Sequence, residues 1–324
     1  MRVNNHSFER YADVTQALHS PALLPHGSAA GDTAPHLALR EAVGQALAPA
    51  RLASWRSHFA GHAQALVEVL AEGVPVDLVA AYAEPWALEL ALTVTGAPRE
   101  QGAQCEALAR QIYLAAADAR DGTPAAEALA AAAALARVLS SPAARSGAMS
   151  DVQTFVALSQ SLPALLAGAW HALLCHPVAL ADLFASASSV AGCVGELLRL
   201  GSPARAVFRV AVEDLVIGHT RVRRGDRVAL LLWAANRDPD RFADPELLDP
   251  ARDTAGHLSL GAGLHPCAGA HLVRMAVVIA TQALLARCAS LAWADGAEVA
   301  VGWRGGFAMR APAALPVVRW RVGG

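Results

Sequence analysis

The chain has 324 residues, of which 55% are hydrophobic and 17% are charged, and its formal net charge is −2. This apolar fraction is enough for a large core and excludes a disordered chain. All 26 basic residues are arginine and they form no basic block, so we expect no nucleic-acid partner. Five scattered cysteines do not make a disulfide framework, which favours a reducing, cytoplasmic compartment.

The N-terminal two thirds of the chain is expected to be helical. The first residues contain no apolar segment of the kind that a signal peptide needs. Apolar residues recur at spacings of three and four over 40–70 and 83–94, and an alanine-rich run follows over 125–139. A further helix is predicted over 190–200, where Gly201 begins a turn.

A long segment in the middle of the chain carries no charge. No Asp, Glu or Arg occurs between Asp151 and Asp182, and 155–175 is mostly apolar and long enough to cross a bilayer. However, it contains Gln160 and Pro163 and has no basic flank. The sequence therefore favours a helix buried inside a large α-rich protein over a membrane span.

The last third of the chain contains strand-like segments. Stretches 207–212 and 227–232 are rich in Val and Leu, and Gly225 marks a turn between them, which predicts a small sheet. A Pro- and Asp-rich loop follows, then a Gly-rich segment that leads into an apolar helix over 268–287. The sequence contains no repeat and no linker, so a single domain over 1–324 is expected.

The segment 260–269, LGAGLHPCAG, is the most informative in the chain. Its pattern predicts that Cys267 lies in the first turn of a helix, where free amides and the helix dipole favour a thiolate. Its glycines allow the backbone to approach a flat or bulky ligand. A structural cysteine beside a turn is one alternative. A zinc site with His265 and His271 is another, although it lacks a fourth ligand.

Charged residues at helical or strand spacing form three further candidates. Glu196 and Arg199 are three residues apart and share a helix face, as do His36 and Arg40, four apart. Arg209 stands within an apolar strand, where a buried charge needs an anionic partner. Each pair taken alone is more typical of a solvated surface.

Taken together, these motifs resemble the cytochrome P450 family. The family's haem-ligand motif F-G-x-G-x-H-x-C-x-G matches 260–269, with Leu260 in place of the phenylalanine. Shorter family motifs match at E-x-x-R 196–199, H-x-x-x-R 36–40, AANRDP 234–239 and YADVTQAL 11–18. The resemblance covers nearly the whole chain. It implies a mainly α fold with small β-sheets, a P450-like fold truncated at the N-terminus.

The resemblance also implies a cofactor, haem b, and the residues that hold it. Cys267 would be the axial thiolate ligand of the iron, which favours O–O cleavage. The implied cofactor-binding residues are His36, Arg40, Arg209, His265, Cys267 and Gly269. Glu196 and Arg199 would form a structural ion pair. The arginine that completes this pair in the family is missing from 245–248, and Arg252 is the candidate replacement.

The long helix departs from the family pattern at its catalytic positions. The family's A-G-H-E-T-T aligns with ALSQSL at 157–162, so the acid becomes Gln160 and the threonine becomes Ser161. Gln160 cannot ionise, whereas Ser161 can still form hydrogen bonds, and these two are the candidate catalytic residues. Pro163 should distort the helix. We hypothesise that this distortion opens a groove for oxygen; a helix break without catalytic meaning is the alternative.

The front of the chain is shorter than the family pattern. Few residues precede the expected helix at 11–18, and the connection 18–33 and the region 101–151 are reduced. We expect the sheet at 207–232 to lack its usual neighbours, which would leave an edge free for a second copy of the chain. A less covered pocket would admit a large or carrier-tethered substrate. The alternative is a monomer whose neighbouring segments cover both gaps.

The sequence therefore predicts a soluble, cytoplasmic haem-thiolate oxidoreductase without membrane partners. It would act on a small organic molecule, a biosynthetic intermediate of secondary metabolism, with O2 and electrons from a ferredoxin or flavodoxin. Two alternatives stay open: a related haem enzyme that uses peroxide or catalyses a rearrangement, and a haem-binding protein without turnover.

Overall fold

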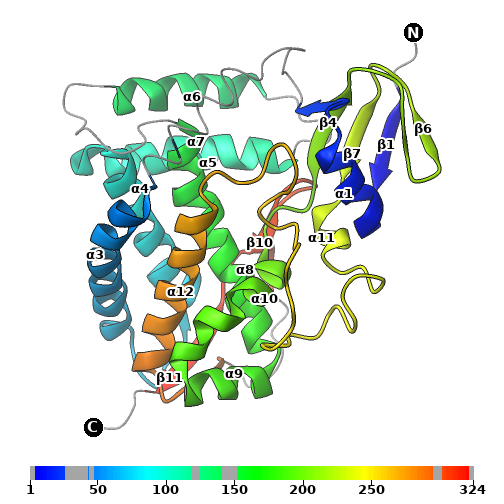
Figure 1. Ribbon diagram of the computed structural model, residues 1–324. Coiled ribbons are helices and arrows are strands. Elements are labelled where there is room, and N and C mark those ends of the chain that lie inside the picture. Colours follow the sequence, from blue (N-terminus) through cyan, green and yellow to red (C-terminus); the bar gives the residue numbers. More distant parts are fainter. Residues whose placement is uncertain are drawn as a thin grey trace.

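A helical body and a small sheet lie side by side in the computed structural model, which describes residues 4–25, 43, 47–118, 125–140, 152–294 and 301–320 (Figure 1). The α-helices are α1 Tyr11–His19, α3 Pro49–Glu68, α4 Glu84–Thr95, α5 Gly102–Asp118, α6 Ala126–Leu139, α7 Val152–Val156, α8 Leu162–Leu174, α9 Pro177–Ala185, α10 Val190–Gly201, α11 Leu232–Ala235 and α12 Ala270–Arg287. The strands are β1 Asn5–Phe8, β2 Leu23–Pro25, β3 Val76–Asp77, β4 Val207–Ala211, β5 Leu215–Ile217, β6 Thr220–Val222, β7 Arg227–Leu230, β8 Ser290–Trp293, β9 Trp303–Gly305, β10 Arg310–Pro312 and β11 Pro316–Trp320. The mainly α fold with small sheets is therefore confirmed.

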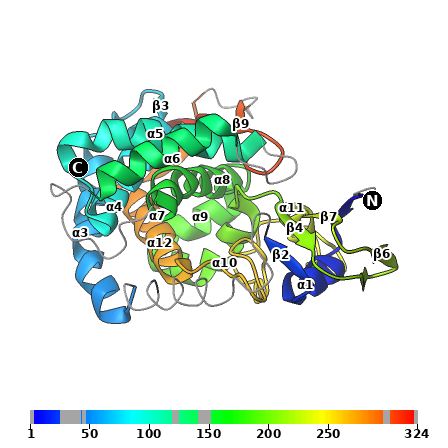
Figure 2. The ribbon, with the colours of Figure 1, turned by 90° about the horizontal axis from the view of Figure 1, so that it is seen from above.

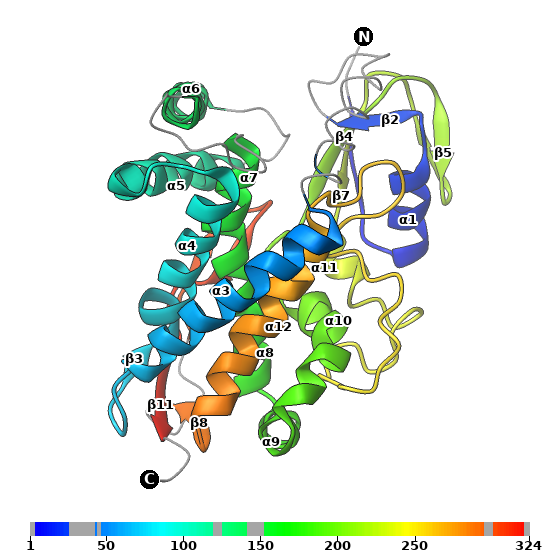
Figure 3. The same cartoon turned by 60° about the vertical axis from the view of Figure 1, so that its left-hand side comes forward.

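The helical body has α8 and α12 at its centre. Figure 3 shows α3 running along α12, and Figure 2 shows α5 and α6 side by side across one end of the body. The ring of Trp170 on α8 stacks on Tyr82 with a centroid separation of 5.3 Å. Tyr82 Oη and Trp170 Nε1 donate to α12, at Ala280 O (2.8 Å) and Thr281 Oγ1 (3.1 Å). Buried aromatic rings with satisfied polar atoms thus hold the central helices together.

Close contact between glycines fixes the crossing of α8 and α10. A Cβ atom on Gly168 would collide with the carbonyl of Gly201, and one on Gly201 would collide with the backbone of Ala169. Only glycine allows the two backbones to approach this closely.

Two helical segments, Val152–Leu174 and Ala270–Arg287, are long and apolar enough to cross a membrane by length and composition. In each, 61% of the apolar window is buried inside the protein. This burial favours their role as core helices of the α-rich body, as expected for the uncharged segment.

The main sheet has the strand order β1-β7-β4-β2. β1 pairs in parallel with β7, and β2 pairs antiparallel with β4. The expectation that 207–232 lacks neighbours is therefore wrong: short strands from the front of the chain pair with both sides. Asp226 ties β1 to the β6–β7 turn, because its carboxylate accepts from Asn4 N (2.9 Å) and Arg223 N (2.9 Å) and contacts His6 Nε2 (3.0 Å).

A wide helical turn precedes α8. The segment Ala157–Ser161 is π-helical, and Leu162 N bonds to Ala157 O, five residues back. Pro163 follows directly and has no N–H for the usual bond to residue 159. The predicted distortion at Pro163 is therefore confirmed. The same geometry occurs at Val79–Ala83 ahead of Pro85, so a proline of this kind produces the wide turn at two places in the described chain.

Candidate functional site

The Gly-rich loop presents Cys267 at its outer side. Cys267 N donates to Leu260 O (2.7 Å), and Ala270 N donates to Cys267 O (3.3 Å). Helix α12 begins at Ala270 with Gly269 as its N-cap. The prediction that Cys267 lies in the first helical turn is thus wrong, because a separate turn precedes the cap. Its side chain is nevertheless exposed near the positive end of α12.

Two glycines give the loop its shape. Gly261 and Gly263 have φ values of +69° and +66°, the left-handed region that side chains disfavour. A Cβ atom on Gly263 would collide with Leu18 O, at the end of α1, and Leu264 N donates to that carbonyl at 3.3 Å. The backbone of the loop therefore lies against α1 at Gly263 and Leu264. At Gly269 a Cβ would lie 3.9 Å from Cys267 Sγ, an ordinary van der Waals contact, so Gly269 is a direct neighbour of the sulfur.

The wide turn before α8 separates the two candidate catalytic residues. Ser161 is partly exposed and Ala157, four residues earlier on the same face, is exposed. Gln160 is buried, with 8% of its surface accessible. Within the described chain, Gln160 Nε2 and Ser159 Oγ are buried and have no hydrogen-bond partner. The helix face that carries Ser161 is therefore partly exposed, whereas the side chain of Gln160 is buried.

Arg209 is a buried guanidinium in β4. Its Nη1 donates to Phe208 O (2.9 Å), and no carboxylate among the described residues pairs with it. Burial lowers the pKa of Arg209. Such a charge is stable only with an anion beside it. His36 and Arg40, predicted to act with Arg209, lie outside the described residues, and His265 is a partly exposed residue of the Gly-rich loop.

These features fit haem better than a protein-bound metal ion. In the described part of the chain, no three His, Cys, Asp or Glu side chains are grouped to hold a metal, so the zinc alternative with His265 and His271 finds no support. An exposed thiol ahead of a helix, by contrast, suits an iron that takes one protein ligand. The buried Arg209 without a carboxylate suits a cofactor that brings its own carboxylates.

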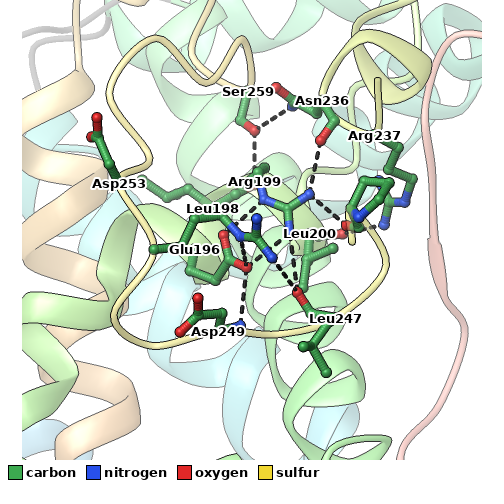
Figure 4. A network of polar contacts seen from close by, with 12 residues as sticks. Glu196, Leu198, Arg199, Leu200, Asn236, Arg237, Leu247, Asp249, Asp253 and Ser259 are labelled. Carbon is green, nitrogen blue, oxygen red and sulfur yellow. Dashed lines mark hydrogen bonds and ion pairs between the residues drawn. The ribbon is translucent and has the colours of Figure 1, made fainter. Parts of the chain in front are cut away.

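A buried ion-pair network underlies the loop (Figure 4). Arg199 donates to both carboxylate oxygens of Glu196, with Nε to Oε2 at 2.7 Å and Nη2 to Oε1 at 2.8 Å. Arg252 Nε also donates to Glu196 Oε1, at 3.0 Å, which confirms the replacement that the sequence suggested. Asp249 N adds a fourth donor at 3.1 Å. Glu196 and Arg199 are almost fully buried, and the single Glu196 carboxylate has two guanidinium partners.

The network continues into the Gly-rich loop through Asn236. Its Oδ1 accepts from Leu258 N (2.7 Å), and its Nδ2 donates to Ser259 Oγ (2.9 Å). Ser259 Oγ in turn donates to Leu198 O on α10 (2.8 Å), and Asn236 O accepts from Arg199 Nη1 (2.8 Å). The start of the loop is therefore anchored to α10. The AANRDP stretch contained the signal for this role, but only contacts in three dimensions reveal it.

His257 lies buried beside this network. Burial, and then the positive charges of Arg274 and Arg199, lower the pKa of His257 to about 4. The imidazole is therefore neutral at pH 7.

Comparison with known protein families identifies one match. The family model "Cytochrome P450" matches residues 189–296, which include α10, the two inner strands of the main sheet, β4 and β7, and the Gly-rich loop. Nocardicin C N-oxygenase of Nocardia uniformis subsp. tsuyamanensis is 31% identical over 332 residues, covering 92% of this chain and 82% of that protein. Cytochrome P450 monooxygenase PikC of Streptomyces venezuelae is 42% identical, over 49% of this chain and 38% of its own length. The biotin biosynthesis cytochrome P450 of Bacillus subtilis is 43% identical, over 38% and 31%. The matched segments of these last two relatives thus span less than two thirds of their length.

Solved structures extend the similarity over the whole chain. P450BioI in complex with an acyl carrier protein ligated to hexadec-9Z-enoic acid aligns with a TM-score of 0.81 at 26% identity, covering 97% of this chain and 91% of that one. CYP164A2 of Mycobacterium smegmatis has the same fold, with a TM-score of 0.84 at 23% identity and coverages of 97% and 91%.

Proposed function

The chain belongs to the cytochrome P450 family, and on this premise we propose that it is a haem-thiolate monooxygenase with Cys267 as the iron ligand. The observation that carries the proposal is the exposed thiol of Cys267 in a Gly-rich loop whose backbone lies against α1 and whose start is anchored to α10. When bound, haem b supplies an iron centre at which a thiolate ligand favours O–O cleavage.

The side chains of this protein hold the cofactor from two sides. Arg209 would bind one propionate through charge-assisted hydrogen bonds, because it has no carboxylate among the described residues. His36, Arg40, His265 and Gly269 complete the proposed set, and Gly269 lies next to the sulfur. The Glu196 network would support the thiolate loop rather than touch substrate.

We propose that the hydroxyl of Ser161 takes part in proton transfer. Its hydroxyl can both donate and accept a hydrogen bond, and it lies on the open face of the wide turn. Gln160 cannot ionise, and its buried amide would orient rather than transfer a proton. In this proposal the wide turn at Ala157–Ser161 would provide the groove for oxygen beside the hydroxyl.

The proposed substrate is a small organic intermediate of a biosynthetic pathway. Relatives are named for such reactions, among them nocardicin C N-oxygenase and 6-deoxyerythronolide B hydroxylase. The similar P450BioI was solved with a carrier-bound acyl chain, which supports a carrier-tethered substrate as one form. Electrons would come from a ferredoxin or flavodoxin in the cytoplasm. A homodimer stays part of the proposal, although the sheet has neighbours on both sides: within the described chain β1 is an end strand, and a second copy would pair there.

A second candidate function keeps the haem and changes the oxidant. Gln160 in place of the family's acid weakens general-acid assistance, which favours an enzyme that uses peroxide or rearranges its substrate.

The ferrous CO spectrum of the purified protein tests the assignment. We expect a red-shifted Soret band that disappears in Cys267→Ala and persists in Cys175→Ala. Loss of the band in Cys175→Ala alone would refute the site. Turnover of a substrate panel with a ferredoxin–reductase pair, set against turnover with peroxide, then separates the two candidate functions.

A further inference from the structure

A second cavity, of about 400 Å³, lies away from the proposed haem site. The C-terminal half of α8, the end of α10, α11 and the β9–β10 hairpin line it. None of the described haem-site residues contributes to its wall. Gly168, the first residue of α8 that lines it, is seven residues beyond Ser161, which corresponds to about 10 Å along the helix.

The wall of this cavity is strongly basic. It contains three guanidinium groups, those of Arg205, Arg237 and Arg310, and a single carboxylate, that of Glu246. Glu246 is already engaged by Arg237, whose Nε lies 3.1 Å from its Oε2. Neither Arg205 nor Arg310 has a carboxylate partner anywhere in the described chain. The cavity therefore attracts anions.

One donor in the wall is buried and unused. Arg237 Nη2 donates to Leu200 O (3.1 Å), but Nη1 has no hydrogen-bond partner among the described residues. The Arg237 side chain is only 12% exposed. Because Nη1 is itself buried and the other two nitrogens already donate, Arg237 contributes its positive charge to the cavity rather than an accessible donor.

Aromatic rings hold the arginines in place. Arg237 and Arg205 lie over the ring of Trp233, at 4.3 Å and 5.6 Å from its centroid. Arg310 lies 4.8 Å from the centroid of Trp303. Stacking in this way leaves the N–H edges of Arg205 and Arg310 available for bonds to a planar anion.

The rest of the wall is mixed: one part is small and apolar, and the other carries the side chains of His171, Cys175, His176 and Ser202. Gly168, Gly201 and Ala172 leave a surface without side-chain bulk where α8 and α10 cross. A cavity of this volume with an apolar wall and a few convergent donors is typical of a small-molecule site.

We propose that this cavity binds a small aromatic carboxylate, with the carboxylate held by Arg205 and Arg310, the charge of Arg237 close by, and the ring against the apolar part of the wall. Arginine binds carboxylates through paired hydrogen bonds, and the glycine-lined wall favours a carbon-rich anion over inorganic phosphate.

Calorimetric titration with 2-naphthoate tests the proposal. The haem-loaded protein is used with imidazole bound at the iron, so that the haem pocket is occupied. We expect saturable binding of 2-naphthoate, and at least about tenfold weaker binding of the neutral 2-naphthalenemethanol and of inorganic phosphate. Arg310→Gln and Arg205→Gln should each weaken 2-naphthoate binding by about tenfold.

Arg51→Gln is the matched control, because Arg51 also lies over a tryptophan, Trp55, at 6.0 Å, but outside the cavity. It should leave the affinity unchanged. Arg310 is exposed, so Arg310→Gln should fold normally even if Arg205→Gln does not. Absence of binding, equal loss in Arg51→Gln, equal affinity for the alcohol or for phosphate, or displacement of 2-naphthoate by higher imidazole concentrations would each overturn the proposal.

Discussion

Arg252 Nε donates to Glu196 Oε1 at 3.0 Å, so a guanidinium from the loop after α11 completes the ion pair that Glu196 and Arg199 begin on α10. Arg252 also donates to Asp244 O (3.2 Å) and Ala243 O. A single side chain therefore satisfies both a buried carboxylate and the carbonyls of the surrounding loop.

Replacing Arg252 should destabilise the fold. Arg252→Ala removes a charged donor from Glu196, which is 1% exposed, and we expect a loss of about 1–3 kcal/mol in the free energy of unfolding, measured by urea denaturation. Arg199→Ala should cost more, about 3–5 kcal/mol, because it leaves the carboxylate without its main partner. Arg221→Ala, which breaks the exposed pair with Asp214, is the control and should change stability by no more than about 1 kcal/mol. If Arg252→Ala and Arg221→Ala lower the free energy of unfolding equally, the buried contact of Arg252 stabilises the fold no more than an exposed ion pair does.

Arg209 should control haem retention. Without its guanidinium a propionate loses a charge-assisted partner, so Arg209→Ala should release haem faster during dialysis, and the Arg40→Ala, Arg209→Ala double variant faster still. Haem absorbance per protein, followed over time, is the measurement. Arg223→Ala, an exposed arginine of the nearby β6–β7 turn, should retain haem as the unmodified protein does. Full retention in the double variant would remove Arg40 and Arg209 from the site.

Ser161 and Ser159 should differ in their effect on turnover. Ser161→Ala removes the hydroxyl on the open face, so we expect more peroxide released and less product formed per O2 consumed. Ser159→Ala removes a buried hydroxyl that has no partner in the described chain, and this ratio should not change. If the two variants behave alike, Ser161 has no role in proton handling.

Gln160→Glu should make the amount of product formed per O2 consumed depend on pH. A carboxyl group at this buried position has a raised pKa, because burial disfavours its charged form. Product yield per O2 should therefore rise as the pH falls and the acid becomes protonated, while the unmodified protein shows no such change. An unchanged pH profile would argue that residue 160 is isolated from the reaction.

Asp226 should make the free energy of unfolding depend on pH in the acidic range. The amide of Asn4, the amide of Arg223 and the ring of His6 lower its pKa from 3.8 to about 2. A carboxyl group whose pKa is lower in the folded state contributes stability above pH 4, and that contribution is lost as the pH falls towards 2. Asp226→Asn should therefore reduce the urea midpoint at pH 6 and flatten its decline below pH 4. Asp240→Asn, at an exposed carboxylate, should follow the unmodified curve.

The sequence predicted long periodic elements and motifs well. Helices expected over 83–94, 190–200 and 268–287 lie within two residues of α4, α10 and α12, because their apolar spacing and flanking glycines are local signals. The membership of the P450 family followed from motifs that each specify a fixed chemical group.

What the sequence could not predict depends on distant contacts. β1 and β2 are short strands with weak propensity, and they form because β7 and β4 offer edges about 200 residues away in the chain. The exact place of Cys267 before α12 depends on the hydrogen bond to Leu260 O. The second cavity brings Trp233 and Trp303 together from different elements, and neither residue belongs to a motif.

The contact between Gly168 and Gly201 has a consequence for how this enzyme can change over evolution. The wide turn with Ser161 leads directly into α8, and α10 supports the loop with Cys267, so the distance between these two sides of the proposed haem site depends on the α8–α10 crossing. Because backbone touches backbone there, the gap is independent of side-chain size. Residues that line the substrate pocket can therefore vary without altering it, whereas Gly168→Ala or Gly201→Ala would force the two sides apart. The substrate preference can thus change during evolution while the geometry of the cofactor site stays the same. Substitutions should be least tolerated at Gly168 and Gly201, although neither residue belongs to the proposed haem site.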